Sequence, residues 1–222
     1  MIRFALNETN NYLSWDENHH LNELVIESPT LFRKIVKNFS TDLNESNYFT
    51  ESGKQLNSKY IDFISNPFQL NFNNKKAITT LLKLLVKQST SESFYNETNS
   101  FKSYIIKYLD ELIYAENFNF EVESDPDFSI DAIAKAINIH IVGDEDNFVD
   151  LLVDYLDMMA ELSDIKLFAF LNLRAFLESE DLDVLLKSIN NHQLDVLFIE
   201  SQQQDVIPNT GRLIIDKDLC EI

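Results

Sequence analysis

The sequence predicts an α/β protein that consists of a discontinuous head with a mostly parallel sheet and an inserted α-helical leg. Two short, continuous apolar runs near the C-terminus are typical of parallel strands that are buried on both faces. Amphipathic helical patterns occupy the middle of the chain and separate these runs from strand patterns at the N-terminus. We therefore place the first part of the head at 1–70, the leg at 71–138 and the second part of the head at 139–222.

The first part of the head combines short strands with one helix. Strand patterns lie at 2–6, 11–15, 23–26, 47–50 and 60–64. Before the last two of these strands, Leu31, Ile35 and Phe39 recur at helical spacing and predict a helix over 30–40.

The leg is predicted to consist of three helices. Asn73 and Asn74 offer an N-terminal cap for the first helix, which continues through Leu85. The apolar face of a second, longer helix holds Phe101, Tyr104, Ile105, Tyr108, Leu109, Leu112 and Ile113. A third, short helix spans 129–137. We expect the aromatic residues of the second helix to belong to a core, which argues against base stacking there.

The second part of the head is predicted to extend the sheet. A strand pattern at 139–142 precedes an amphipathic helix. The apolar face of this helix holds Phe148, Leu151, Leu152, Tyr155, Leu156, Met159 and Leu162. The apolar runs at 166–171 and 195–200 flank another helix, so together they form a βαβ unit. His140 alternates into the strand at 139–142, where we expect a hydrogen-bonded structural histidine.

The sequence lacks the motifs of several enzyme classes. A phosphate-binding loop needs glycines that let backbone N–H groups wrap an anion, and the segment at 27–34 has none. No two histidines have the spacing of a zinc site, and no G-x-S-x-G turn is present for a nucleophilic serine. Cys220 is the single cysteine, so redox chemistry is a poor explanation. We therefore expect a protein that is not an enzyme.

The formal net charge of −19 belongs to the second half of the chain. Residues 1–110 carry 12 basic and 12 acidic residues, whereas the rest of the chain carries 6 basic and 25 acidic residues. Within the first half, residues 28–110 hold 11 basic residues against 7 acidic ones. Net charge argues against a nucleic-acid-binding protein, but screening over about 10 Å lets a local basic face bind DNA.

Apolar segments long enough for a membrane are missing from the sequence. No uninterrupted apolar run approaches the roughly 18 residues of a transmembrane helix. The first residues also lack the apolar segment of a signal peptide. We therefore expect a cytoplasmic protein that does not contact a membrane.

An acidic cluster follows the second helix of the leg. It consists of Glu121, Glu123, Asp125 and Asp127. Extended backbone would place the first two carboxylates on one side, about 7 Å apart. Such a cluster either stays solvated or binds a hard cation through oxygen ligands, for which calcium is the natural choice. It is not an EF-hand, because Ile130 stands where that loop needs glycine.

Two groups of basic residues are candidates for DNA binding. Lys76, Lys83 and Lys87 follow one another at i, i+7 and i+11 and form a stripe opposite the apolar face of the first leg helix. A second group, on the helix of the head, consists of Arg33, Lys34 and Lys37. Spaced lysines on a helix suit phosphate contacts, which position a duplex without reading its sequence. The alternative is an ordinary solvated surface.

A second acidic surface follows the helix after 147. It consists of Asp150, Asp154, Asp157 and Glu161. Such a stripe repels DNA, so it either faces solvent or binds a basic partner.

The end of the chain carries a family resemblance. The segments at 167–177, 192–200 and 212–219 resemble the short form of the ring-forming, double-stranded-DNA-binding protein family of type II-A CRISPR spacer acquisition. The resemblance extends over nearly the whole chain and is weakest in the helical insert. No catalytic motif carries it.

This resemblance implies a fold and a function. The fold is a degenerate P-loop-like head that has lost its phosphate loop, together with a helical leg. The function is a homotetrameric ring that holds calcium and encircles double-stranded DNA from free ends, with the CRISPR adaptation integrase and the effector nuclease as partners. The cluster around Glu121 and Asp125 resembles the calcium-binding region of the family, whereas the lysines rest on spacing and local charge alone.

Two further hypotheses remain open at this point. An acidic protein-interaction scaffold, with weak or indirect DNA contact, would use the negative surface. A metal-dependent nuclease would use the carboxylates around Asp125, but two-metal catalysis needs a convergent cage with metals about 4 Å apart. A linear cluster supports that chemistry weakly.

Overall fold

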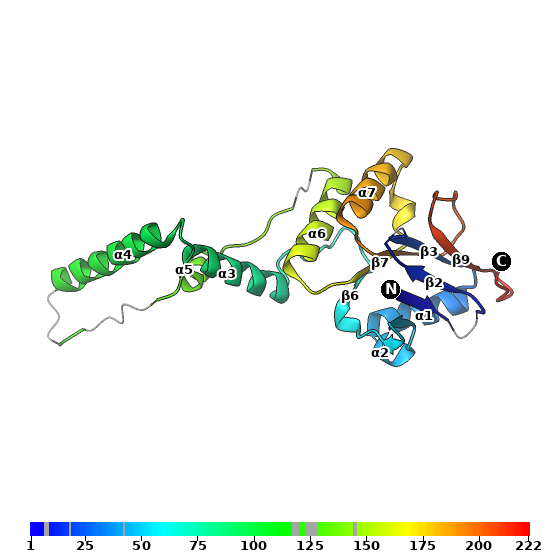
Figure 1. Cartoon of the computed structure of the whole chain (residues 1–222), viewed down its shortest axis with the longest axis horizontal. Helices are drawn as coiled ribbons and strands as arrows, with labels where there is room; N and C mark the ends of the chain where they lie inside the picture. Colours follow the sequence, from blue (N-terminus) through cyan, green and yellow to red (C-terminus); the bar gives the residue numbers. More distant parts are fainter. Residues whose placement is uncertain (7–8, 18, 42, 117–119, 123–127, 144–145) are drawn as a thin grey trace. The chain divides into compact units, whose positions relative to one another are not determined.

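The computed structural model describes residues 1–6, 9–17, 19–41, 43–116, 120–122, 128–143 and 146–222. The chain divides into two compact units (Figure 1). The head consists of Met1–Phe72 and Gly143–Ile222, and the leg of Asn73–Val142. These junctions lie slightly beyond 70 and 138, the ends of the first two segments in the sequence-based division. No helix among the described residues is long and apolar enough to cross a membrane.

A five-stranded parallel sheet forms the centre of the head. Its strands are β3 (Leu21–Ile26), β6 (Ile61–Ile64), β7 (Leu167–Leu171), β8 (Val196–Glu200) and β9 (Gly211–Ile215). They lie in the order β6-β7-β8-β3-β9, and each neighbouring pair is parallel. The predicted α/β fold with a mostly parallel sheet is therefore confirmed.

Helices cover both faces of this sheet. The long helices are α1 (Pro29–Thr41), α6 (Phe148–Leu162) and α7 (Ser179–His192), and the shorter ones are α2 (Leu43–Ser46), η1 (Ser58–Tyr60) and η2 (Leu173–Phe176). Figure 1 shows α6 and α7 on one side of the sheet and α1 and α2 on the other. The buried face of α1, with Ile35 at its centre, joins Leu24 and Leu197 in one core. The sheet is buried on both faces, as its continuous apolar strands require.

A small antiparallel sheet closes the core on the α1 side. Its strands are β1 (Ile2–Ala5), β2 (Tyr12–Trp15), β4 (Phe49–Glu51) and β5 (Lys54–Gln55), in the order β2-β1-β4-β5. Phe4 and Phe49 pack with ring centroids 5.0 Å apart. The indole N–H of Trp15 donates a hydrogen bond of 2.9 Å to the Val196 carbonyl, which ties this sheet to β8. The sequence indicated β1, β2 and β4 but neither β5 nor the pairing of these strands in a second sheet.

One charged cluster is buried in the head, on the face of the sheet opposite to α1. Glu23 of β3 lies 2.8 Å from Arg174 Nη1 and 2.6 Å from Arg212 Nε. Glu200, at the end of β8, accepts a hydrogen bond of 3.1 Å from the Arg174 backbone N–H. Burial, followed by the nearby carboxylate of Glu23, raises the pKa of Glu200 to about 7.

Three helices form the leg. They are α3 (Lys75–Ser89), α4 (Tyr95–Glu116) and α5 (Ile130–Ala136), and α3 packs against α5. The two ends of the insert are joined by the side chain of Asn73. Its Nδ2 donates to the Ile141 carbonyl at 3.0 Å, and its Oδ1 accepts from the Ile141 N–H at 2.8 Å. The three predicted helices of the leg are present.

The strand predicted at 139–142 is wrong. These residues form no ladder, because the Ile141 backbone groups are bonded to the Asn73 side chain instead of a neighbouring strand. His140 is exposed, and its ring Nδ1 lies 3.0 Å from the Asn138 carbonyl oxygen, so it is not a histidine inside a sheet. Polar and apolar residues alternate in this segment as they do in a strand, but the segment forms no strand.

The aromatic residues of α4 do not lie in a core of this chain. No residue of α4 is buried, and Tyr104 and Tyr108 are 69% and 52% exposed. The apolar face that the sequence predicted is present, but no described part of the same chain covers it. Apolar residues at helical spacing show that a helix has an apolar face. They do not show whether the same chain or another molecule covers that face.

Candidate nucleic-acid interface

Helix α3 presents a positive surface in the leg. Asn74 caps the helix, since its side chain accepts a hydrogen bond of 3.0 Å from the Ala77 N–H. Ala77 and Leu82 are buried, which fixes the face that α3 turns inward. The helix contains four lysines and no acidic residue, and all four lysines are exposed: Lys75, Lys76, Lys83 and Lys87.

The predicted lysine stripe lies on one side of α3. The helical rise places Lys76 and Lys83 about 10 Å apart along the axis, and Lys83 and Lys87 about 6 Å apart. Their spacing puts them on the face opposite to Ala77 and Leu82. Three ammonium groups in a row can contact successive phosphates along a nucleic-acid backbone.

Helix α1 carries the second predicted group, which belongs to the head. Leu31, Ile35 and Phe39 form its buried face, and the helix contains no acidic residue. Lys34 and Lys37 are exposed on the other side of the helix. The structure thus groups the predicted lysines by helix, with three on α3 in the leg and two on α1 in the head.

The leg lacks the side chain that most often reads DNA sequence. Residues 73–142 contain seven lysines and no arginine. Arginine reads guanine through paired hydrogen bonds in the major groove, whereas lysine acts on phosphate as a point charge. The composition of the leg therefore favours contacts to the backbone over contacts to bases.

The predicted calcium ligands lie mostly outside the described residues. Glu123, Asp125 and Asp127 fall there, and Glu121 is described and exposed. In the described part of the chain, no three His, Cys, Asp or Glu side chains are arranged to hold a metal ion. The calcium site therefore stays a prediction, supported by the chemistry of four carboxylate donors.

Asp131 near the acidic cluster is already engaged by its own helix. Lys135 donates to its Oδ2 at 2.6 Å, and the Ser129 hydroxyl donates to Oδ1. The hydrogen bond from Lys135, then that from Ser129, lowers the pKa of the Asp131 carboxyl. This carboxylate is satisfied without a metal ion.

Comparison with known proteins decides the family. The family described as CRISPR-associated protein (Cas_Csn2) matches residues 38–219, most of the chain. The chain belongs to the Cas_Csn2 family. This is the type II-A CRISPR adaptation family, so the resemblance found in the sequence is confirmed and the chain has a role in CRISPR adaptation. Among solved structures, a putative ABC transporter (ATP-binding protein) from Pyrococcus furiosus aligns over 95% of this chain and 96% of its own, with 11% identity and a TM-score of 0.37.

The acidic stripe of this Cas_Csn2 protein lies on α6. Asp150, Asp154 and Glu161 are exposed, whereas Asp157 is half-buried against α7. His192 Nδ1 lies 2.6 Å from Asp157 Oδ1. Burial raises the pKa of Asp157, and His192 opposes this rise. Three of the four predicted carboxylates are therefore exposed on α6, and the fourth lies against His192 of α7.

Proposed function

We propose that this Cas_Csn2 protein binds double-stranded DNA, without sequence preference, as a homotetrameric ring during spacer acquisition. The observation that carries the proposal is α3, a helix with four exposed lysines and no acidic residue in a chain of net charge −19. The helix lies within residues 28–110, where 11 basic residues outnumber 7 acidic ones, so its charge belongs to a locally positive part of the chain. Phosphate neutralisation by lysine is the main source of sequence-independent affinity for DNA.

A ring resolves the conflict between net charge and DNA binding. Several copies of α3 that face one lumen would add their positive potentials where the duplex passes. Acidic surfaces elsewhere would be screened over about 10 Å at 0.1 M salt. The negative charge would then keep the outside of the ring free of DNA.

Self-association is supported by α4. Four of its exposed apolar side chains recur at helical spacing and lie on one helix face: Phe101, Tyr104, Tyr108 and Leu112. Contiguous exposed apolar surface of this kind marks an interaction site. A second copy of the same chain is the partner that the proposed ring requires.

Calcium is proposed as the ion of the acidic cluster at Glu121, Glu123, Asp125 and Asp127. Carboxylate oxygens are the ligands that this hard cation prefers. The ion would also neutralise a carboxylate-rich segment that otherwise opposes DNA binding.

The proposed role is not enzymatic, and it is cytoplasmic. The segment between β3 and α1, where phosphate-binding α/β folds carry their loop, has no glycine to wrap a phosphate. The proposed partners, which the family resemblance implies, are the CRISPR adaptation integrase and the effector nuclease, and these would supply the chemistry.

Charge reversal on α3 tests the proposal. The double variant Lys76→Glu with Lys83→Glu is expected to lose retention of linear duplex DNA about tenfold or more at fixed moderate salt. The matched control reverses two exposed lysines of the head, Lys54→Glu with Lys187→Glu. It changes net charge equally and is expected to retain DNA nearly as well as the parent protein. Filter retention and thermal melting of both variants are the measurements.

An acidic protein-interaction scaffold is the second candidate. It is favoured by the exposed carboxylates of α6, which suit a basic protein partner and repel DNA. If the Lys76 and Lys83 variant retains DNA like the parent protein, α3 has no part in binding and the scaffold becomes the better account.

A further inference from the structure

Three phenylalanines form an aromatic cluster on the head, and two of them are exposed. The rings of Phe68 and Phe148 stack with centroids 4.8 Å apart and an interplanar angle of 25°. The ring of Phe176 meets Phe68 edge-on, with centroids 5.1 Å apart and an angle of 82°. Phe68 is 58% exposed and Phe176 is 47% exposed. We call Phe68, Phe148 and Phe176 the aromatic patch.

The three rings come from three segments near one edge of the parallel sheet. Phe68 follows the carboxyl end of β6, Phe176 ends η2 just after β7, and Phe148 is the first residue of α6. Contacts between residues so distant in sequence are tertiary. Single exposed apolar residues are common on proteins, whereas a cluster of large ones that touch each other marks an interaction surface.

Hydrogen bonds and burial hold the rings in place. The Phe68 backbone N–H donates to Asn66 Oδ1 at 3.1 Å. The side chain of Asn147 caps α6 by accepting from the Val149 N–H at 2.9 Å, which fixes the start of the helix at Phe148. Leu173, in the same turn as Phe176, is fully buried. A fixed aromatic surface loses little conformational entropy when it binds a partner.

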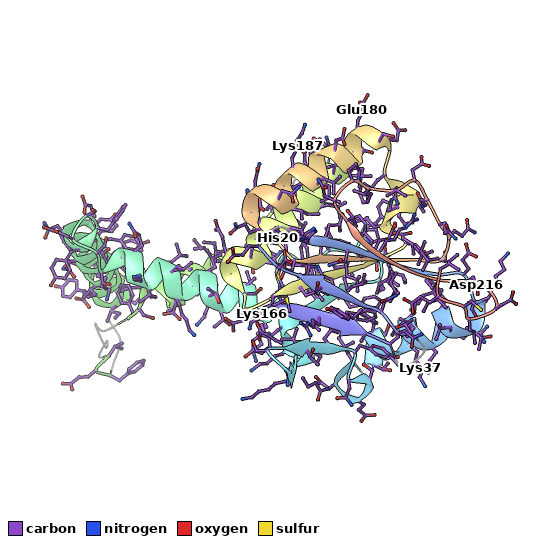
Figure 2. All side chains as sticks on the ribbon, turned by 45° about the vertical axis from the view of Figure 1, so that its right-hand side comes forward. His20, Lys37, Lys166, Glu180, Lys187 and Asp216 are labelled. Atoms are coloured by element: carbon purple, nitrogen blue, oxygen red, sulfur yellow. The ribbon has the colours of Figure 1, made fainter. Side chains whose placement is uncertain are left out.

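The aromatic patch lies on segments that are rich in carboxylates. The segments that carry it, 65–72, 146–152 and 172–181, contain five acidic residues and one arginine. The acidic residues are Asp146, Asp150, Glu178, Glu180 and Asp181. The arginine is Arg174, which is buried and paired with Glu23 at 2.8 Å. Figure 2 shows Glu180 at the outer side of α7.

We propose that the aromatic patch is a docking site for a basic segment of a protein partner that inserts one or two apolar side chains. The apolar anchor packs against Phe68 and Phe176, and lysines or arginines on either side of it face the carboxylates. Arginine can also stack its planar guanidinium on an exposed phenylalanine ring. This inference goes beyond the proposed function, since it needs neither the ring nor DNA.

Charge selects this partner over the alternatives. A nucleic acid could stack bases on the rings, but its phosphates would meet carboxylates with no available cation among the residues of these three segments. A central apolar anchor inside a charged rim is also the usual arrangement of protein interfaces. Opposite charge at the rim speeds association and excludes acidic partners.

A short synthetic peptide, rich in lysine and carrying leucine and phenylalanine, tests the site on the full-length protein. Two matched peptides serve as controls. In one, glutamate replaces the lysines, and in the other, serine replaces the apolar residues. Fluorescence anisotropy measures affinity, and amide chemical shifts locate binding. We expect the lysine and phenylalanine peptide to bind best, with shifts at 66–70, 146–150 and 174–180.

Substitutions in the protein provide the second arm. Phe68→Ser with Phe176→Ser is expected to weaken binding of the basic peptide about tenfold. Glu180→Lys, which leaves the rings in place, is expected to weaken it about threefold at low salt. Tyr12→Ser removes an equally exposed aromatic residue of the head and is the control without effect. Retention of duplex DNA should be unchanged in all three variants, so this arm is independent of the proposed function.

Five results would overturn the proposal. The first is no binding of the lysine and phenylalanine peptide up to about 1 mM. The second is equal binding of the glutamate peptide. The third is that chemical shifts fall on the α6 stripe alone, and the fourth is that short DNA displaces the peptide from the patch. If Phe68→Ser with Phe176→Ser instead alters the oligomeric state, the patch faces a second copy of the chain and the assignment to a basic partner is wrong.

Discussion

Glu200 is the residue whose protonation bears most directly on stability. It is only 2% exposed, and burial in the cluster with Glu23 raises its pKa from 4.5 to about 7. A carboxyl with a raised pKa binds its proton more tightly in the folded state than in the unfolded one. Its contribution to stability is therefore complete below about pH 4.5 and is lost as pH rises through about 7.

Replacing Glu200 by glutamine tests this coupling. The amide can still accept the Arg174 N–H, but it does not ionise. We expect Glu200→Gln to remove the loss of stability between pH 5 and pH 8, an effect of roughly 3 kcal/mol at most. Urea unfolding at the two pH values is the measurement, with the exposed Glu180→Gln as control. Parallel loss of stability in the parent and in Glu200→Gln would show that another group titrates.

The helix α4 has an exposed apolar face, which we propose to lie in the interface between copies of the chain. Tyr108 and Leu112 lie one turn apart on its exposed apolar face. We expect Tyr108→Ser with Leu112→Ser to dissociate the oligomer without lowering the stability of the head, because neither side chain is buried within the chain. Sedimentation velocity measures this. Asn96→Ser with Asn99→Ser changes exposed polar residues of the same helix and should leave the oligomer intact. An intact oligomer in the apolar variant would remove α4 from the interface.

Helices and strands whose apolar residues follow a clear helical or strand pattern were predictable from the sequence. The strands β7 and β8, with α7 between them, were recognisable because continuous apolar runs and a helical repeat alternate there. The segment at 139–142 was assigned wrongly, since a strand needs a neighbouring strand and the sequence does not reveal that Asn73 binds its backbone. The edge strand β9 was missed as part of the sheet because its run is short and contains Arg212.

The candidate site was predictable only in part. The lysines of α3 and α1 follow from helical spacing, and the structure confirms that they are exposed. The aromatic patch was not predictable, because Phe68, Phe148 and Phe176 come from distant segments and only the fold brings them together. The apolar face of α4 was visible, but periodicity does not distinguish an intramolecular core from an interface between chains.

At the scale of the whole molecule, calcium should link stability to assembly. A ligand that binds only the native state stabilises it according to its concentration and affinity. We expect a saturating chelator to lower the melting temperature or dissociate the oligomer, and added calcium to reverse the change. Asp125→Asn with Asp127→Asn should behave like the chelated parent protein. If neither the chelator nor the double substitution changes the melting temperature or the oligomeric state, the assignment of calcium is wrong.

The proposal that the chain forms a DNA-binding ring rests on the distribution of charge. A chain of net charge −19 can bind DNA only where its positive side chains are concentrated. The most direct test compares retention of linear duplex DNA with that of covalently closed circles of the same sequence, at fixed moderate salt, with calcium and then with chelator. The account predicts that linear DNA is retained in calcium, that circles are not, and that blocking both ends or removing calcium abolishes retention. Equal retention of circles and linear DNA, or none of either, would contradict a ring that threads onto DNA ends.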